Sequence, residues 1–124
     1  MLVVDDNPMV RQVIARVLEM EGHAAHQVES GEQALAALEG EPEGWDAVIM
    51  DLTMPRMSGL EALALLRKTW PTLPVVITSG FSRSGVPAMQ DDPCTQFLEK
   101  PFTSEQLLEV FVNVVRSARR AAGG

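Results

Sequence analysis

Short apolar segments alternate along this chain with longer amphipathic stretches, and this alternation limits the possible folds more than any other feature. The apolar segments at 2–4, 47–50, 74–78 and 95–98 predict strands, and 24–28 predicts a weaker one. Several of these strands are apolar on both faces, which is typical of strands buried inside a parallel sheet. Because the intervening stretches place apolar residues at helical spacing, the sequence predicts an α/β fold in which helices cover both faces of a five-stranded parallel sheet.

Residues that favour helix starts support these boundaries. Asn7 and Pro8 open the first predicted helix, because Asn caps the first amides and Pro fits the first turn. Ser30 and Ser58 are the predicted N-caps of the next two helices, and the last helix is predicted from 104 to about 119. The first helix is expected to bury the apolar residues Val10, Val13, Ile14, Val17 and Leu18.

The connection between the fourth and fifth strands, residues 79–94, breaks the pattern. It contains Gly80, Gly85, Pro87 and Pro93, and a Pro inside a helix costs about 3 kcal/mol. We therefore expect a degraded fourth helix, short or missing, in a segment of low local stability.

The composition disfavours several classes of protein. A length of 124 residues predicts a single domain, which we assign to 1–120 with a tail at 121–124. A net charge of −7 disfavours direct binding to nucleic acid or to an anionic membrane surface. One cysteine fits a reducing compartment, no apolar run approaches the roughly 18 residues of a membrane span, and the early acids argue against a signal peptide. These features predict a cytoplasmic protein.

Polar residues follow the predicted strands at one edge of the sheet. Asp5 and Asp6 come after the first strand, Asp51 ends the third, Thr78 ends the fourth, and Lys100 follows the fifth. In parallel α/β sheets, ligands bind outside the carboxyl ends of the strands. Three carboxylates at this edge would repel one another, so the pattern predicts a cation, and hard oxygen ligands suit Mg²⁺.

The same residues favour phosphoryl-transfer chemistry. Asp51 is the candidate nucleophile, because carboxylates can form aspartyl-phosphate. Mg²⁺, the Lys100 ammonium and the Thr78 hydroxyl would each bind one phosphoryl oxygen, and this neutralisation of charge is the main requirement of the reaction. The backbone carbonyl of Thr53 is a further candidate ligand of the metal.

Four motifs in register make the chain similar to a known family. They are Leu2-Val3-Val4-Asp5-Asp6-Asn7, then Ile49-Met50-Asp51-Leu52-Thr53-Met54-Pro55 with Met57-Ser58-Gly59, then Ile77-Thr78-Ser79-Gly80, and finally Phe97-Leu98-Glu99-Lys100-Pro101-Phe102. In these residues the chain resembles the receiver domains of two-component response regulators, over nearly its whole length. The resemblance implies the flavodoxin-like fold with strand order 2-1-3-4-5.

The resemblance also implies a role for each residue. Asp51 would accept a phosphoryl group from a phosphohistidine on a sensor histidine kinase or a phosphotransfer domain, and Asp5, Asp6, Asp51 and the Thr53 carbonyl would hold Mg²⁺. Lys100, on a cis peptide to Pro101, would pair with the phosphoryl group. Thr78 and Phe97 would switch position together. Apart from this self-catalysed transfer and its reversal by hydrolysis, no enzyme activity is expected.

Other runs of residues bear on the context and assembly of the chain. The runs at 79–82 and 101–108 resemble receivers attached to hybrid sensor histidine kinases. The chain ends without room for an output domain, which predicts either a single-domain regulator or a receiver from a larger protein. The last helix has extra apolar residues; these widen the core face or, with the 79–94 connection and the fifth strand, form a dimer surface as often happens in this family.

Two hypotheses of other classes stay open. A Mg²⁺-dependent phosphatase with an aspartyl nucleophile would need a second acid two residues after Asp51 as general acid, but that position is Thr53. Turnover of a phosphate ester would support it. A phosphate-independent interaction module would be supported by a failure to bind metal, although the full acidic set and Lys100 argue against it.

Overall fold

The predicted strands form one parallel sheet. The computed structural model describes residues 1–41, 44–80 and 92–123. Its strands are β1 (Leu2–Val4), β2 (His26–Val28), β3 (Val48–Asp51), β4 (Val75–Ser79) and β5 (Thr95–Glu99). They lie in the order β2-β1-β3-β4-β5, and each neighbouring pair is parallel. The predicted α/β class, the strand number and the order 2-1-3-4-5 are confirmed.

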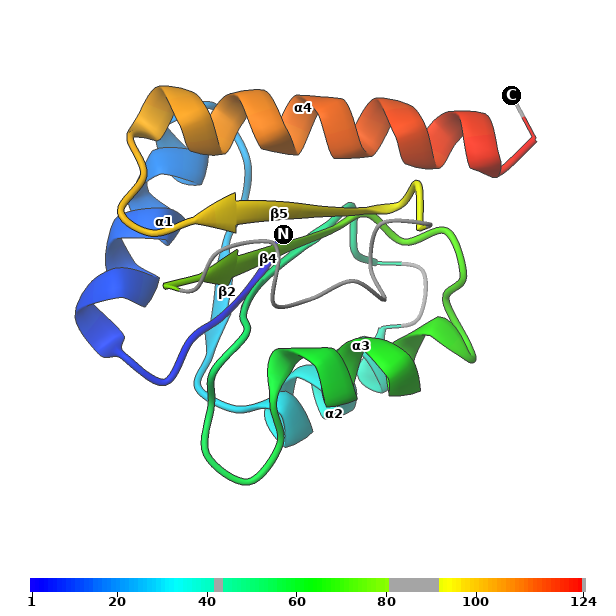
Figure 1. Ribbon diagram of the computed structural model, residues 1–124, viewed down its shortest axis with the longest axis horizontal. Coiled ribbons are helices and arrows are strands. Elements are labelled where there is room, and N and C mark those ends of the chain that lie inside the picture. Colours follow the sequence, from blue (N-terminus) through cyan, green and yellow to red (C-terminus); the bar gives the residue numbers. More distant parts are fainter. Residues whose placement is uncertain (42–43, 81–91, 124) are drawn as a thin grey trace.

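Helices cover both faces of the sheet. The described helices are α1 (Pro8–Met20), α2 (Gly31–Gly40), α3 (Gly59–Arg67) and α4 (Ser104–Ala121). In Figure 1, α1 and α4 lie on one side of the sheet and α2 and α3 on the other. The prediction of a degraded helix between β4 and β5 falls on residues 81–91, outside the described residues.

The helices begin where the capping residues predicted. The side chains of Asn7, Ser30 and Ser58 accept hydrogen bonds from the first amides of α1, α2 and α3. The start of α4 has a stronger device that the sequence analysis did not identify. Thr103 and Gln106 form a reciprocal capping box, which fixes where the chain turns into α4 after β5.

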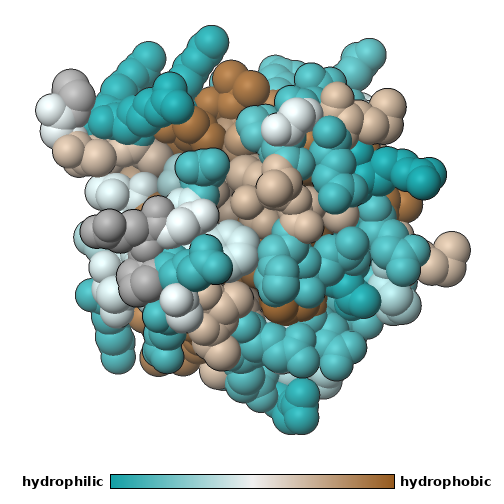
Figure 2. Space-filling model, turned by 180° about the vertical axis from the view of Figure 1, so that it is seen from behind, coloured by the Kyte–Doolittle hydropathy of each residue, from teal (hydrophilic) through white to brown (hydrophobic). Residues whose placement is uncertain are grey.

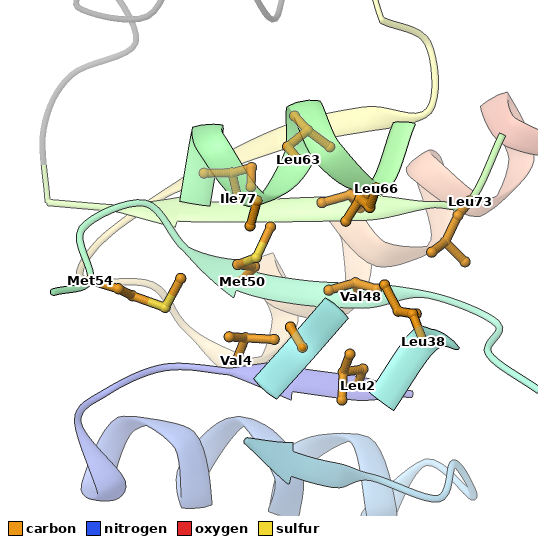
Figure 3. Packing of buried hydrophobic residues seen from close by; sticks show 13 residues of the cluster. Leu2, Val4, Leu38, Val48, Met50, Met54, Leu63, Leu66, Leu73 and Ile77 are labelled. Atoms are coloured by element: carbon orange, nitrogen blue, oxygen red, sulfur yellow. The ribbon is translucent and has the colours of Figure 1, made fainter. Parts of the chain in front are cut away.

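Strand residues alternate between two cores. Figure 3 shows the cluster beneath α2 and α3, in which Leu2, Val4, Met50 and Ile77 of the strands lie together with Leu38 of α2 and Leu66 of α3. The intervening strand residues, such as Val3, Ile49 and Val76, enter the cluster beneath α1 and α4. Burial on both faces explains why these strands are continuously apolar in sequence. It also holds their carboxyl ends, which carry the polar residues, at a fixed edge.

One predicted core position of α1 is wrong. Ile14 and Leu18 are buried, and Val10 and Val17 pack against the same cluster, but Val13 is 61% exposed. The apolar residues of α1 span a wider arc than one face of the helix can bury. Val13 and Met9, which is 76% exposed, therefore form an apolar strip on the outside of α1.

One face of the molecule is largely polar. On the face shown in Figure 2, hydrophilic side chains predominate and apolar ones form separate patches. No helix in the described ranges has both the length and the apolar character needed to cross a membrane.

An arginine network closes the amino-terminal ends of β4 and β5. Arg67, the last residue of α3, donates from Nε to Asp92 at 2.8 Å and from Nη1 to the carbonyls of Trp70 and Leu73. Its Nη2 donates to the Cys94 carbonyl and to Oγ1 of Thr95, the first residue of β5. Both charged side chains are mostly buried. The network therefore ties α3, the α3–β4 connection and β5 into one unit.

The Asp92 carboxylate is well matched to this network. Burial alone would raise the pKa of Asp92, but hydrogen bonds from Thr95, Arg67 and the Cys94 amide outweigh burial and lower it. Because the folded pKa lies below the unfolded value of about 3.9, the contribution to stability is full above that value. It is lost as the pH falls through the lowered folded pKa.

We predict that Arg67→Met lowers the free energy of unfolding by about 3 kcal/mol at pH 7, because it removes the ion pair with Asp92 and the guanidinium's hydrogen bonds to Thr95 and to three backbone carbonyls. Arg67→Lys should recover only part of this, since an ammonium cannot reproduce the planar fork of donors. Urea unfolding followed by tryptophan fluorescence measures both. In Asp92→Asn, stability should fall less steeply than in the parent when the pH drops below about 4. A loss under 1 kcal/mol in Arg67→Met would contradict the assignment of the network as a major tie.

Candidate functional site

Three carboxylates meet at the carboxyl edge of the sheet. Asp5 and Asp6 follow β1 directly, and Asp51 is the last residue of neighbouring β3. One oxygen from each of the three lies within 4.8 Å of the others. Asp5 and Asp51 are buried at 1% and 7% exposure, whereas Asp6 is exposed. The structure thus brings together the acids that the sequence placed at this edge.

Lys100 inserts its ammonium group between two of these acids. Nζ lies 3.2 Å from Oδ1 of Asp51 and 3.4 Å from Oδ2 of Asp5. The lysine follows β5, where its backbone amide donates to the Ser79 carbonyl and its peptide to Pro101 is cis, as the family resemblance predicted. The pairing of β5 with β4 therefore positions the Lys100 ammonium close to the acids at the ends of β1 and β3.

The charges shift the ionisation of both partners. Burial raises the pKa of Asp51, and the neighbouring Asp5 carboxylate raises it further, against the opposing effect of Lys100. Burial alone would lower the pKa of Lys100, but Asp51 and Asp5 outweigh this and raise it. With three carboxylates against one ammonium, the site keeps an excess of negative charge. A divalent cation is the counter-charge that this excess favours.

Thr78 supplies a hydroxyl without a partner. It lies on β4 directly beside Asp51 of β3 in the sheet register. Its Oγ1 is buried and makes no hydrogen bond to any described residue. Leaving a buried hydroxyl unpaired costs roughly 1–3 kcal/mol. A buried polar atom in this condition beside an acidic cluster marks a position where a ligand oxygen would be bound.

The loop after Asp51 is held close to the end of its strand. The Gly59 amide donates to the Leu52 carbonyl, and a Cβ on Gly59 would clash with the Asp51 carbonyl oxygen. No other residue type fits this approach without a backbone shift. Thr53 is exposed in this loop, so it offers a hydroxyl and a carbonyl but no acid. Position 53 therefore provides no general acid, which the phosphatase hypothesis requires.

Comparison with known proteins decides the family. The model of the response regulator receiver domain matches residues 1–112. The chain belongs to the response regulator receiver domain family.

The relatives of this receiver domain include longer signalling proteins. It is 35% identical over 127 residues to the sensory/regulatory protein RpfC of Xanthomonas campestris, covering 98% of this chain and 17% of that protein. It is 38% identical to the response regulator MprA of Mycolicibacterium vanbaalenii, covering 86% of this chain and 46% of that protein. The chain therefore spans less than half the length of these relatives.

Solved structures share the fold. A response regulator receiver domain from Clostridium thermocellum matches with a TM-score of 0.86 at 27% identity, over 97% of this chain and 96% of that one. The receiver domain of the hybrid histidine kinase CckA matches with a TM-score of 0.76 at 31% identity, over 91% and 96%. The receiver fold expected from the four motifs is confirmed.

Phe97 lies on the strand next to that of Thr78. It is on β5, paired in register with Ile77, the residue before Thr78. Its ring is half-buried and packs against the cluster beneath α2 and α3. The structure thus places Phe97 one strand away from the site, and its inward switching stays a prediction.

The donor set of the receiver domain fits Mg²⁺. The three carboxylates present hard oxygen ligands, and the exposed Asp6 leaves the site open to the waters that Mg²⁺ retains. The Thr53 carbonyl, on the loop beside these acids, stays a predicted ligand. Sequence reasoning missed how the acids are held. The Asn7 backbone amide donates to Oδ1 of Asp5 at 2.8 Å, a contact that follows from the cap geometry rather than from a motif.

We predict that millimolar Mg²⁺ raises the melting temperature of the receiver domain by several degrees, because a ligand of the folded state alone stabilises it by about 1 kcal/mol or more at several times its Kd. Asp6→Ala should abolish most of this rise, and its exposed position limits any cost to the fold. Glu39→Ala, which removes an exposed acid at the end of α2, is the control and should keep the full rise. An unchanged response in Asp6→Ala would place the metal elsewhere.

Proposed function

We propose that this receiver domain accepts a phosphoryl group on Asp51 from a phosphohistidine of a histidine kinase or phosphotransfer domain, and that the acylphosphate switches its conformation. The observation that carries the proposal is the Lys100 ammonium between Asp51 and Asp5, beside the unpaired Thr78 hydroxyl. The region from residue 1 to 120 is the proposed phosphoacceptor domain, and the cytoplasm is its proposed compartment.

The chemistry requires a nucleophile and neutralisation of charge. A carboxylate oxygen of Asp51 attacks phosphorus, so that an O–P bond forms and the N–P bond of phosphohistidine breaks; the departing imidazole takes up a proton. Asp5, Asp6, Asp51 and the Thr53 carbonyl would hold Mg²⁺, which would supply positive charge to the phosphoryl oxygens. Hydrolysis of the acylphosphate by water reverses the modification. Beyond these steps no substrate turnover is proposed.

Lys100 and Thr78 would bind the remaining oxygens. In the unmodified domain Lys100 already lies 3.2 Å from Asp51, so it needs little movement to meet a phosphoryl oxygen on that side chain. Donation by the Thr78 hydroxyl would satisfy an atom that is otherwise buried and unpaired. Both changes lie at the ends of β4 and β5. The repacking of Phe97 on β5 would then carry the charge change to the surface.

The proposed partner surface is an apolar groove beside the site. It runs between α1 and the β5–α4 connection and is lined by Met9, Val10, Val13, Pro101 and Phe102, next to Lys100. The exposed strip on α1 forms one of its walls. An amphipathic helix that carries the phosphohistidine is the occupant that fits such a groove. The alternative dimer surface includes residues 81–91 and lies partly outside the described residues.

The first test concerns the nucleophile. We predict that the parent, incubated with Mg²⁺ and acetyl phosphate, gains 80 Da on intact-mass spectrometry, and that the adduct is lost on treatment with hydroxylamine. Asp51→Asn keeps the shape of the side chain but not the attacking charge, so it should gain no adduct. Asp46→Asn, an exposed acid before β3, is the control and should label like the parent. Equal labelling of the parent and Asp51→Asn would refute Asp51 as the phosphoacceptor.

A second test concerns the partner. The donor is the autophosphorylated histidine kinase that transfers fastest to the parent in a panel of purified kinases. Val13→Glu should slow transfer from it at least tenfold, because it places a charge in the apolar groove, while labelling by acetyl phosphate stays unchanged. Val112→Glu, on the exposed side of α4, is the matched control and should leave both rates unchanged. Unimpaired transfer to Val13→Glu would show that the donor docks elsewhere.

A further inference from the structure

Arg11 binds the backbone of the Asp5–Asp6 pair. It lies on α1, half-buried, and its Nη1 donates to the backbone carbonyl of Asp5 at 2.8 Å. Its Nε donates to the side-chain oxygen of Gln27 on β2 at 3.3 Å. The guanidinium therefore bridges α1, the end of β1 and the edge strand β2. It does so without contacting any of the three carboxylates.

The carbonyl that Arg11 binds belongs to the peptide between Asp5 and Asp6. The Asp5 amide still continues the sheet, donating to the Val28 carbonyl at 3.2 Å. Its carbonyl comes after β1 has ended, and on that side β2 also ends at Val28. Since a buried carbonyl needs a donor, the arginine takes the place of the missing strand. The orientation of this one peptide influences the direction of the Asp6 side chain, which follows it, relative to the Asp5 side chain, which precedes it.

The other contacts of Asp5 involve its side chain, whereas Arg11 binds its backbone carbonyl. Its carboxylate accepts from the Asn7 amide at 2.8 Å and from Lys100 at 3.4 Å. Asp6, by contrast, is exposed. The hydrogen bond from Arg11 therefore fixes the Asp5 carbonyl, and this restricts the directions in which the Asp6 side chain can point. Rotation of the peptide would move the Asp6 carboxylate away from Asp5 and Asp51.

We infer that Arg11 is a positioning residue for the metal site: its bond to the Asp5 carbonyl orients the Asp5–Asp6 pair for binding a divalent cation. This inference rests on the proposed function, because it concerns the same site. The residue acts through the ligands and touches neither the metal nor the phosphoryl group. Loss of such an outer contact lowers metal affinity by roughly 10- to 100-fold.

The identity of the side chain matters as well as its charge. Arg11 uses two differently placed N–H groups for two acceptors, which the fixed fork of a guanidinium allows and a single ammonium does not. Arg11→Lys keeps the charge beside the acids but loses one of the two bonds. Arg11→Met loses the charge and both bonds. Comparing the two separates the positioning effect from simple attraction between a cation and the acidic site.

The experiment is a Mg²⁺ titration of the full chain by isothermal calorimetry. The Kd for Mg²⁺ should rise about tenfold or more in Arg11→Met, and most of this rise should persist in Arg11→Lys. Gln27→Met removes the other anchor of the guanidinium without changing any charge, and should raise the Kd by a smaller factor. Arg16→Met removes an exposed charge from the same helix and is the matched control, with the Kd expected within twofold of the parent.

Labelling with acetyl phosphate distinguishes positioning from general loss of structure. At saturating Mg²⁺, Arg11→Met should approach the parent's labelling rate, because Asp51, Lys100 and Thr78 are unchanged; only the Mg²⁺ concentration needed for half the rate should increase. A Kd equal to the parent's in both Arg11 variants would overturn the inference and leave the proposed function standing. If affinity returns fully in Arg11→Lys, charge alone acts and the positioning role is refuted. Absence of Mg²⁺ binding in the parent would refute the proposed function and this inference together.

Discussion

Repulsion among three carboxylates at one edge of the sheet is the constraint on which the rest of the site depends. Asp5, Asp6 and Asp51 come from neighbouring strand ends, and two of them are buried. Carboxylates at such distances disfavour one another's charged forms, and a cation among them relieves this repulsion. In the unmodified chain the Lys100 ammonium takes that place, at 3.2 and 3.4 Å from two of the acids. Because Lys100 follows β5 and the acids lie at the ends of β1 and β3, the ion pairs form only if β1, β3, β4 and β5 lie in their observed order.

The fold supplies this geometry through ordinary packing. Strands that bury both faces cannot slide, since each side chain is fixed in one of two cores. The close approach of Gly59 to the Asp51 carbonyl keeps the following loop against the strand end. The nucleophile candidate is therefore held by backbone contacts, while the charges around it stay only partly balanced. This is the arrangement expected of a site that waits for a metal ion and an anionic group.

Sequence patterns predicted most of the fold and the composition of the site. Strands that are buried on both faces are continuously apolar in sequence, so their positions could be inferred without coordinates. The polar residues at their ends lie at one edge because the strands are parallel, so the composition of the site could be inferred as well. The prediction that Val13 is buried was wrong, because an apolar residue at helical spacing does not reveal how wide a face of the helix the sheet can cover. The Arg67 network and the Arg11 contacts were missed for a different reason: their partners are mostly backbone carbonyls or residues far along the chain, which leave no motif.

The two ends of β4 and β5 differ in how well their polar groups are satisfied. At the amino ends, Arg67 uses its donors on Asp92, Thr95 and three carbonyls, and the charges there are matched. At the carboxyl ends, the Thr78 hydroxyl is buried without a described partner and the acids outnumber Lys100. A group added at Asp51 would therefore find an unpaired hydroxyl and the nearby Lys100 ammonium at one end, and a fully bonded anchor at the other. On the proposed function, rearrangement around Thr78 and Phe97 would leave the anchored ends to keep the strands in register, so that the switch would be confined to the edge where the charge changes.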